Sequence, residues 1–121
     1  MKKLIWISSS YKDFLEFPPD VKRAVGYALY CAQLGQRHIS AKTLSHMGSA
    51  GIAELREYDG SGTYRVLYSL QLQGYVFVLH AFQKKSRSGI ATPKQELDLI
   101  KARLKEAKIL YETLQDKGKQ P

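Results

Sequence analysis

Apolar residues recur along the chain with the two-residue period of strands in some segments and the three- to four-residue period of helices in others. Residues 2–8 form a short run of β-branched and aromatic side chains and predict a first strand. Residues 52–58, 63–70 and 75–82 predict three more strands, separated by the turn-forming sequences DGSG and QLQG. Connections this short favour an antiparallel meander.

Two helices are predicted between the first strand and the meander. A short one covers residues 11–17 and ends at Pro18–Pro19, because proline lacks an N–H and restricts the residue before it. The second begins near Asp20, carries an apolar stripe for the core, and ends at Gly35, which can adopt the left-handed conformation. Residues 36–50 lack a sustained period, and we interpret them as a basic connecting loop with at most one helical turn, either a substrate lip or an ordinary surface connection.

A long helix is predicted after the meander. Residues 92–95, TPKQ, match a capping box with proline at the first helical position. The helix then carries an apolar stripe that packs on the sheet or on a partner: Leu97, Ile100, Leu104, Ala107, Tyr111 and Leu114. Residues 115–121 lack an apolar anchor, so we expect one domain over residues 1–114 and then a flexible tail. The predicted fold class is α+β, with a small, mostly antiparallel sheet in the order strand, two helices, three strands, helix.

Alternation along the strands assigns side chains to the faces of the sheet. Arg65 and Tyr64 point to opposite sides of their strand. On the last strand the alternation predicts one shared face for four residues: Val76, Val78, His80 and Phe82. Both faces are largely apolar, which favours a sheet covered by helices on both sides.

Composition narrows the classes of function. The 121 residues are 44% hydrophobic, enough for one core, and 19 Lys and Arg exceed 11 Asp and Glu, giving a net charge of +8. This charge attracts phosphate polymers or acidic proteins, although a solvated lysine-rich surface is the plainer interpretation. Cys31 stands alone, which excludes an intramolecular disulfide and a four-thiolate zinc site. The apolar run after Met1 is too short to cross a membrane, and we expect a cytoplasmic protein with no membrane partner.

The sequence holds no Walker loop, dinucleotide glycine fingerprint, metalloprotease helix or paired-cysteine motif. Its histidines, His38, His46 and His80, are too scattered for a local metal motif. We therefore expect no cofactor and no metal site. What remains is a set of polar residues that the meander gathers near one edge of the sheet: Glu54, Arg56, Arg65, His80, Lys84 and Lys85.

This set suits phosphodiester chemistry on RNA, which carries its own nucleophile in the 2′-hydroxyl. Arg65 is the predicted transition-state clamp, because its planar fork matches phosphate oxygens. Lys84 and Lys85 add positive charge or, where desolvation lowers a pKa, transfer a proton. His80 or Glu54 is the candidate base.

Aromatic side chains complete the predicted site. Phe82 and tyrosines such as Tyr64 offer surfaces on which unstacked bases can lie. A structural interpretation is also open: Glu54 and Arg56 share a strand face and could form surface salt bridges with the neighbouring strand, and the lysine pair could discourage edge pairing.

Three segments, GIAELREYD, TYRVLYSL and VLHAFQKKSRSGIATPKQELDLIKARL, in this order of strands and helices, resemble the phage-derived branch of HigB-type toxins in the RelE/ParE superfamily. The resemblance covers nearly the whole chain and is most specific at ELR, YR and FQKK followed by TP. It implies a RelE-like fold. It also implies a basic active patch supported by an acidic and an aromatic residue, with His80 a weaker candidate: Arg56, Arg65, Lys84 and Lys85, then Glu54 and Phe82.

By this resemblance the chain is expected to be the toxin of a type II toxin–antitoxin system, a metal-independent endoribonuclease that cuts mRNA during translation on the ribosome. Its expected partner is a cognate antitoxin of the helix-turn-helix type. Some members of the superfamily inhibit DNA gyrase without cutting RNA, so a toxin that binds gyrase or another protein is the alternative. The fold alone does not decide between them.

Overall fold

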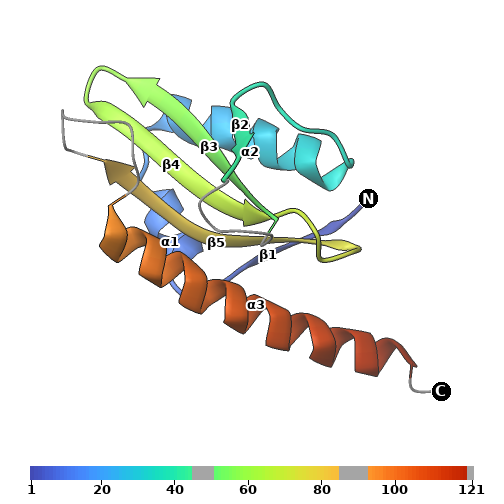
Figure 1. Cartoon of the computed structure of the whole chain (residues 1–121). Coiled ribbons are helices and arrows are strands. Elements are labelled where there is room, and N and C mark those ends of the chain that lie inside the picture. Colours follow the sequence, from blue (N-terminus) through green and yellow to red (C-terminus); the bar gives the residue numbers. More distant parts are fainter. Residues whose placement is uncertain (45–50, 85–92, 120–121) are drawn as a thin grey trace.

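A five-stranded sheet with helices on both faces forms the body of the molecule (Figure 1). The structure is a computed structural model that describes residues 1–44, 51–84 and 93–119. Its elements along the chain are β1 (Lys3–Trp6), α1 (Ser10–Leu15), α2 (Pro19–Gln33), β2 (Ala41–Thr43), β3 (Ile52–Asp59), β4 (Gly62–Ser69), β5 (Tyr75–Lys84) and α3 (Lys94–Lys119). The described part contains no helix with the length and apolar character that crossing a bilayer requires.

The sheet has the strand order β1-β5-β4-β3-β2. β1 pairs in parallel with β5, and every other pairing is antiparallel, so the predicted α+β class and the meander of β3, β4 and β5 are confirmed. β2 corrects the prediction, because it lies within residues 36–50, which we interpreted as a connecting loop. A strand of three residues is too short to show a period, and its pairing comes from β3, where Lys42 lies opposite Glu54.

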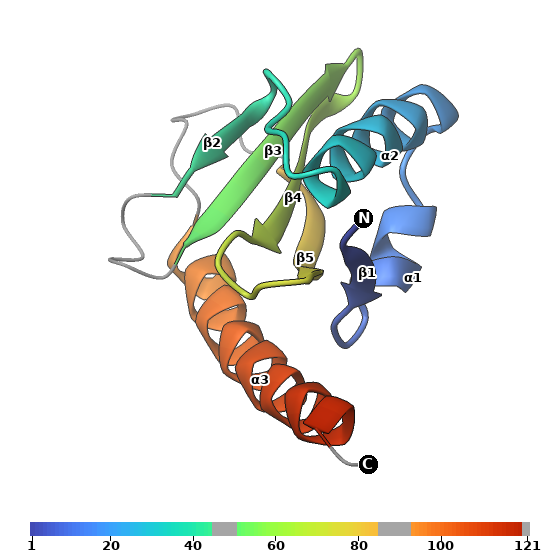
Figure 2. The ribbon, with the colours of Figure 1, turned by 90° about the vertical axis from the view of Figure 1, so that its right-hand side faces the viewer.

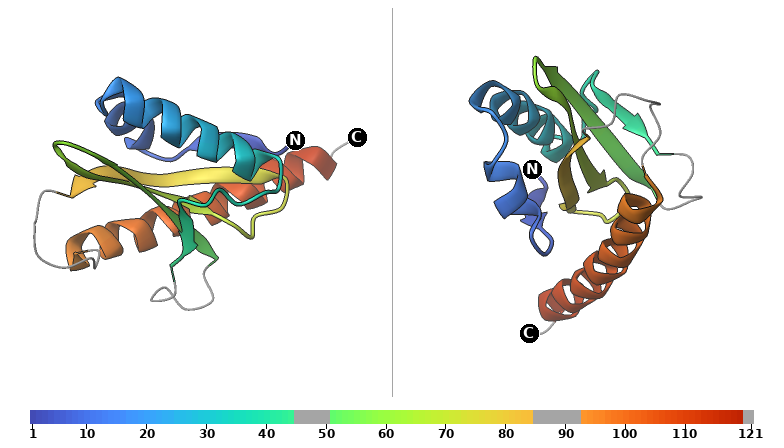
Figure 3. Two further views of the ribbon diagram at one scale, coloured as in Figure 1. Left: turned by 90° about the horizontal axis from the view of Figure 1, so that it is seen from above. Right: turned by 90° about the vertical axis from the view of Figure 1, so that its left-hand side faces the viewer.

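The helices divide into two layers, which Figures 2 and 3 show on opposite sides of the sheet. α1 and α2 cover one side, hereafter the α2 face, where Val25 and Leu29 pack with Val66. α3 covers the other side, hereafter the α3 face, where Ile100 and Leu104 pack with strand residues that include Leu67, Phe77 and Leu79. Each face of the sheet therefore has its own apolar core, as its alternating sequence requires.

A β-bulge in β5 changes which residues share a face. Leu67 of β4 lies opposite His80, but the next residue lies opposite Val78, so Leu79 is the extra residue. Val76 and Val78 consequently belong to the core on the α2 face, whereas His80 and Phe82 lie on the α3 face. The predicted common face for these four residues is wrong, because simple alternation does not hold across a bulge. The bulge places His80 and Phe82 on the same face as Arg65.

The ends of α2 follow the predicted signals. Pro19 is the first helical residue, a position where its missing N–H costs nothing. Gly35 has φ +81°, in the left-handed region. Its N–H donates to the Ala32 carbonyl (3.0 Å), and the Gln36 N–H donates to that of Cys31 (2.9 Å). These bonds satisfy the last carbonyls of the helix and close it.

α3 presents its predicted stripe to the sheet. Ile100, Leu104 and Ala107 are buried in the core on the α3 face. The helix includes residues 115–119, which we predicted to belong to a flexible tail. The domain limits at residues 1–114 stay a prediction.

Candidate functional site

Three neighbouring strands bring oppositely charged residues together on the α3 face. Arg56 of β3 lies opposite Arg65 of β4, and Arg65 lies opposite Phe82 of β5. Lys84 lies two residues beyond Phe82 and therefore on the same face. Glu54 precedes Arg56 by two residues on β3. We call Glu54, Arg56, Arg65 and Lys84 the charged cluster.

Glu54 holds the two arginines of the charged cluster. Its Oε1 accepts from Arg56 Nε at 2.5 Å, and its Oε2 accepts from Arg65 Nη1 at 3.5 Å. Like charges directly opposite each other on neighbouring strands repel. A carboxylate that bridges both guanidinium groups offsets that repulsion and sets their orientation. Glu54 and Arg65 are each only 2% exposed, so the pair works in a low-dielectric environment where its charges are weakly screened.

The cations of the charged cluster perturb one another. Burial, and after it the charge of Arg56, lowers the pKa of Arg65, while Glu54 acts in the opposite direction. Burial likewise lowers the pKa of Lys84, and the charges of Arg65 and Arg56 lower it further. The Lys84 amine thus loses its proton at lower pH than an ordinary lysine does, which suits a group that transfers protons. Lys85, its predicted partner, lies outside the described residues.

An aromatic pair lies beside the charged cluster. The rings of Phe82 and His80 stack with centroids 4.8 Å apart and planes at 19°. Phe82 is half-buried and lies opposite Arg65. An aromatic surface next to a cation suits a ligand that combines a planar ring with a phosphate. The structure thus places Phe82 beside Arg65, and its contact with the substrate stays a prediction.

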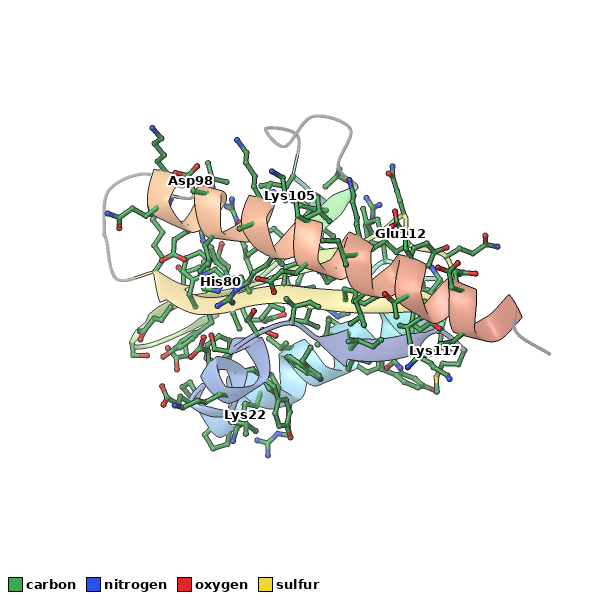
Figure 4. The ribbon with its side chains drawn as sticks, turned by 90° about the horizontal axis from the view of Figure 1, so that it is seen from below. Lys22, His80, Asp98, Lys105, Glu112 and Lys117 are labelled. Atoms are coloured by element: carbon green, nitrogen blue, oxygen red, sulfur yellow. The ribbon has the colours of Figure 1, made fainter. Side chains whose placement is uncertain are left out.

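His80 is held from both ring nitrogens, and Figure 4 shows it between β5 and the first turns of α3. Its Nε2 bonds to a carboxylate oxygen of Glu96. Arg103 Nη1 donates to its Nδ1 (3.3 Å) and to the Leu79 carbonyl (3.1 Å). Arg103 Nη2 also donates to Ser9 Oγ (2.9 Å), just before α1. These contacts indicate a neutral ring with its proton on Nε2, placed as a positioning group rather than as a free base.

We predict that His80 makes the stability of the protein depend on pH. Burial, the largest cause, and the charge of Arg103 lower its pKa below 6.5, while Glu96 and Asp13 act in the opposite direction. Below pH 6.5 the unfolded chain therefore binds more protons than the folded one, and the free energy of unfolding falls as the pH drops towards the folded pKa. Chemical denaturation across this window should show a smaller fall for His80→Gln, whose amide cannot titrate. Identical pH profiles for the two proteins would contradict the prediction.

Tyr64 does not join the charged cluster. It lies on the α2 face, where its ring packs against Phe17 with centroids 4.9 Å apart. Its hydroxyl bonds to Ser61 Oγ (2.6 Å). Tyr64 lines a pocket of about 410 Å³ at the edge of β5, but Asp13 and Glu16 line it too, and their negative charges repel phosphate. His80 and Phe82 also line this pocket, and the contact between Tyr64 and the substrate stays a prediction.

Sequence reasoning missed Arg103 and Glu96. Arg103 is a buried cation that follows Ile100 by three residues and precedes Leu104, so it lies beside the apolar stripe of α3. A charged residue at a core-facing helical position is the signal that could have revealed it. Glu96 lies in the first turn of α3, where an acidic residue is commonly read only as favourable to the helix dipole.

Metal chemistry was not expected from the sequence. Within residues 1–44, 51–84 and 93–119, no three His, Cys, Asp or Glu side chains gather as a metal site would require.

One family profile matches most of the chain. The profile of the family described as "Phage derived protein Gp49-like (DUF891)" matches residues 12–105. The chain belongs to this family. The matched region of this Gp49-like chain runs from α1 into α3 and includes the charged cluster, His80 and Arg103.

Among solved structures, this Gp49-like chain is similar to the RelBE2 toxin–antitoxin complex from Mycobacterium tuberculosis. The sequences are 22% identical, the TM-score is 0.48, and the match covers 70% of this chain and 93% of the other. No curated protein matches the chain with significance.

Proposed function

We propose that this Gp49-like protein is the toxin of a type II toxin–antitoxin system, of the HigB type, and that it cleaves mRNA. The observation that carries the proposal is the charged cluster, in which one buried carboxylate orients two arginines beside a lysine of lowered pKa. The motifs ELR, YR and FQKK, through which the sequence resembles HigB-type toxins, supply the same residues. The proposed partners are mRNA, the translating ribosome and a helix-turn-helix antitoxin.

The residues of the charged cluster can divide the work of phosphodiester cleavage. The 2′-hydroxyl of the RNA attacks the phosphorus, and the 5′-oxygen of the next nucleotide leaves with a proton, so the products are a cyclic phosphate and a 5′-hydroxyl. Arg65, with Arg56, stabilises the charge that develops on the phosphorane oxygens. Lys84, as a neutral amine, accepts the proton of the attacking 2′-hydroxyl and, as the ammonium so formed, gives it to the leaving 5′-oxygen. Phe82 stacks on a base next to the cut. Each step uses a side chain of this protein or a group of the RNA.

The proposed function predicts new 5′-hydroxyl ends in translated mRNA when the protein is expressed from a controlled promoter. A transcript that differs only by a mutated start codon is the control, since ribosomes do not translate it. We expect growth arrest and many ends in the translated transcript, with few in the control. Equal cutting of both transcripts would rule out ribosome dependence.

A toxin that binds gyrase is the alternative, and the same cultures test it. Intact transcripts together with broken DNA would support the gyrase alternative and contradict the proposed nuclease activity. An apolar stripe left open on α3 would favour a protein target, but Ile100, Leu104 and Ala107 pack on the sheet and are not free to bind one. This burial favours the nuclease.

A further inference from the structure

A second pocket lies on the α2 face, on the side of the sheet opposite to the charged cluster. It has a volume of about 270 Å³ and lies between the C-terminal end of α2 and the sheet. Ala32, Leu70 and Val76 contribute apolar wall, and Lys2 and Arg37 contribute two cations. None of its lining residues is Asp or Glu, so the pocket carries net positive charge.

Tyr68 lines this pocket and carries an unusual hydroxyl. Tyr68 is 1% exposed, and among the described residues its hydroxyl has no hydrogen-bond partner. Buried tyrosine hydroxyls nearly always find one, because burying an unpaired polar group costs free energy. Burial raises the pKa of Tyr68, while the nearby charge of Arg37 acts to lower it. The hydroxyl therefore keeps its proton and can donate it to an acceptor beside a cation.

Arg37 is held by a bond of its side chain, and Lys2 is held by bonds of its backbone. Arg37 Nη1 donates to Thr43 Oγ1 (2.8 Å) of β2. The Lys2 N–H donates to the Gln33 carbonyl (2.9 Å), and the Lys2 carbonyl accepts from Gln33 Nε2 (2.9 Å). The bond from the Lys2 N–H uses the Gln33 carbonyl, which lies in the last turn of α2. This end of a helix otherwise disfavours anions.

We infer that this pocket binds a small anion, a carboxylate or phosphate group on a compact apolar body. Arg37 and Lys2 pair with the anionic group, the Tyr68 hydroxyl donates a hydrogen bond to it, and Ala32, Leu70 and Val76 contact the apolar part. The site is separate from the charged cluster and does not depend on the proposed nuclease activity.

Titration of the full chain with inorganic phosphate and with butyrate, each against sodium chloride at equal ionic strength, tests the inference. Amide chemical shifts distinguish the two faces of the sheet, which matters because the charged cluster also attracts phosphate. We expect saturable shifts at residues 36–37 and 68–70 with at least one of the two anions. Arg37→Gln and Tyr68→Phe should each raise the dissociation constant by about tenfold, because each removes one charge-assisted hydrogen bond.

The control is Arg23→Gln, which removes an exposed cation of α2 that pairs with Asp20 and should leave the affinity unchanged. Tyr68→Phe removes a single oxygen atom, so without added anion its melting temperature should equal or exceed that of the parent. Shifts confined to the charged cluster, or affinities at residues 36–37 and 68–70 that neither Arg37→Gln nor Tyr68→Phe changes, would overturn the inference.

Discussion

Replacing Arg65 by lysine is expected to lower the rate of mRNA cleavage by about 10²- to 10³-fold, the usual effect of losing one transition-state donor. Arg65 lies in the middle of the charged cluster, with Arg56 opposite it on one side and Phe82 on the other. Lysine keeps the charge that pairs with Glu54, but it has no planar fork with which to hold the carboxylate and a phosphate together. Cleavage rates under single-turnover conditions, with purified ribosomes and a defined mRNA, measure the effect.

The matched control is Arg23→Lys, the same chemical change on the exposed side of α2, where Arg23 pairs only with Asp20 among the described residues. It should cleave at the parent rate. Circular dichroism and a thermal melt establish that Arg65→Lys remains folded. A folded Arg65→Lys protein that cleaves as fast as the parent would remove Arg65 from the proposed chemistry.

Replacing Arg103 by methionine is expected to lower the free energy of unfolding by about 3 kcal/mol, since it removes hydrogen bonds from a charged donor to three buried or half-buried acceptors. Those acceptors are the Leu79 carbonyl, His80 Nδ1 and Ser9 Oγ. The melting temperature should fall by roughly 10 °C for a domain of this size. Methionine has a similar length and helix propensity, so the loss of stability measures the contribution of the guanidinium group.

Lys105→Met is the control for Arg103→Met, because Lys105 is exposed and Figure 4 shows it on the outer side of the same helix. Its stability should stay within about 0.5 kcal/mol of the parent. Because Arg103 acts on the charged cluster through His80 and Phe82, cleavage by Arg103→Met below its melting temperature should fall less than cleavage by Arg65→Lys. A larger fall would mean that Arg103 contacts the substrate itself.

Alternation and turn signals predicted most of the sheet. β3, β4 and β5 each have enough residues to show a period, and Tyr64 and Arg65 lie on opposite faces as expected. β2 was missed because a three-residue strand exists only through its pairing with β3. The bulge at Leu79 was missed because nothing in VFVLHAF distinguishes an extra residue from a regular one.

Only part of the candidate site could be predicted from the sequence. Arg56 and Arg65 lie within regular strands, so their shared face follows from register and alternation. The contacts of His80 depend on the bulge and on how α3 crosses the sheet, which are tertiary properties. Arg103 and Glu96 lie within the segment that carries the resemblance, but they are 23 and 16 residues from His80 in the sequence and reach it only after α3 packs.

The parallel pairing of β1 with β5 also bears on when a newly made chain acquires its structure. Lys3–Trp6 pair with Tyr75–Val78, and the contact of Ser9 with Arg103 closes an even longer loop. Contacts between residues so distant in sequence form slowly, because the entropy of loop closure is lost before they form. The first strand can therefore pair only after β5 has left the ribosome. The contact of Ser9 with Arg103 forms later still, once α3 has emerged. A growing chain that lacks α3 has neither Glu96 nor Arg103 to hold His80, so the candidate site is completed only when the last helix has formed.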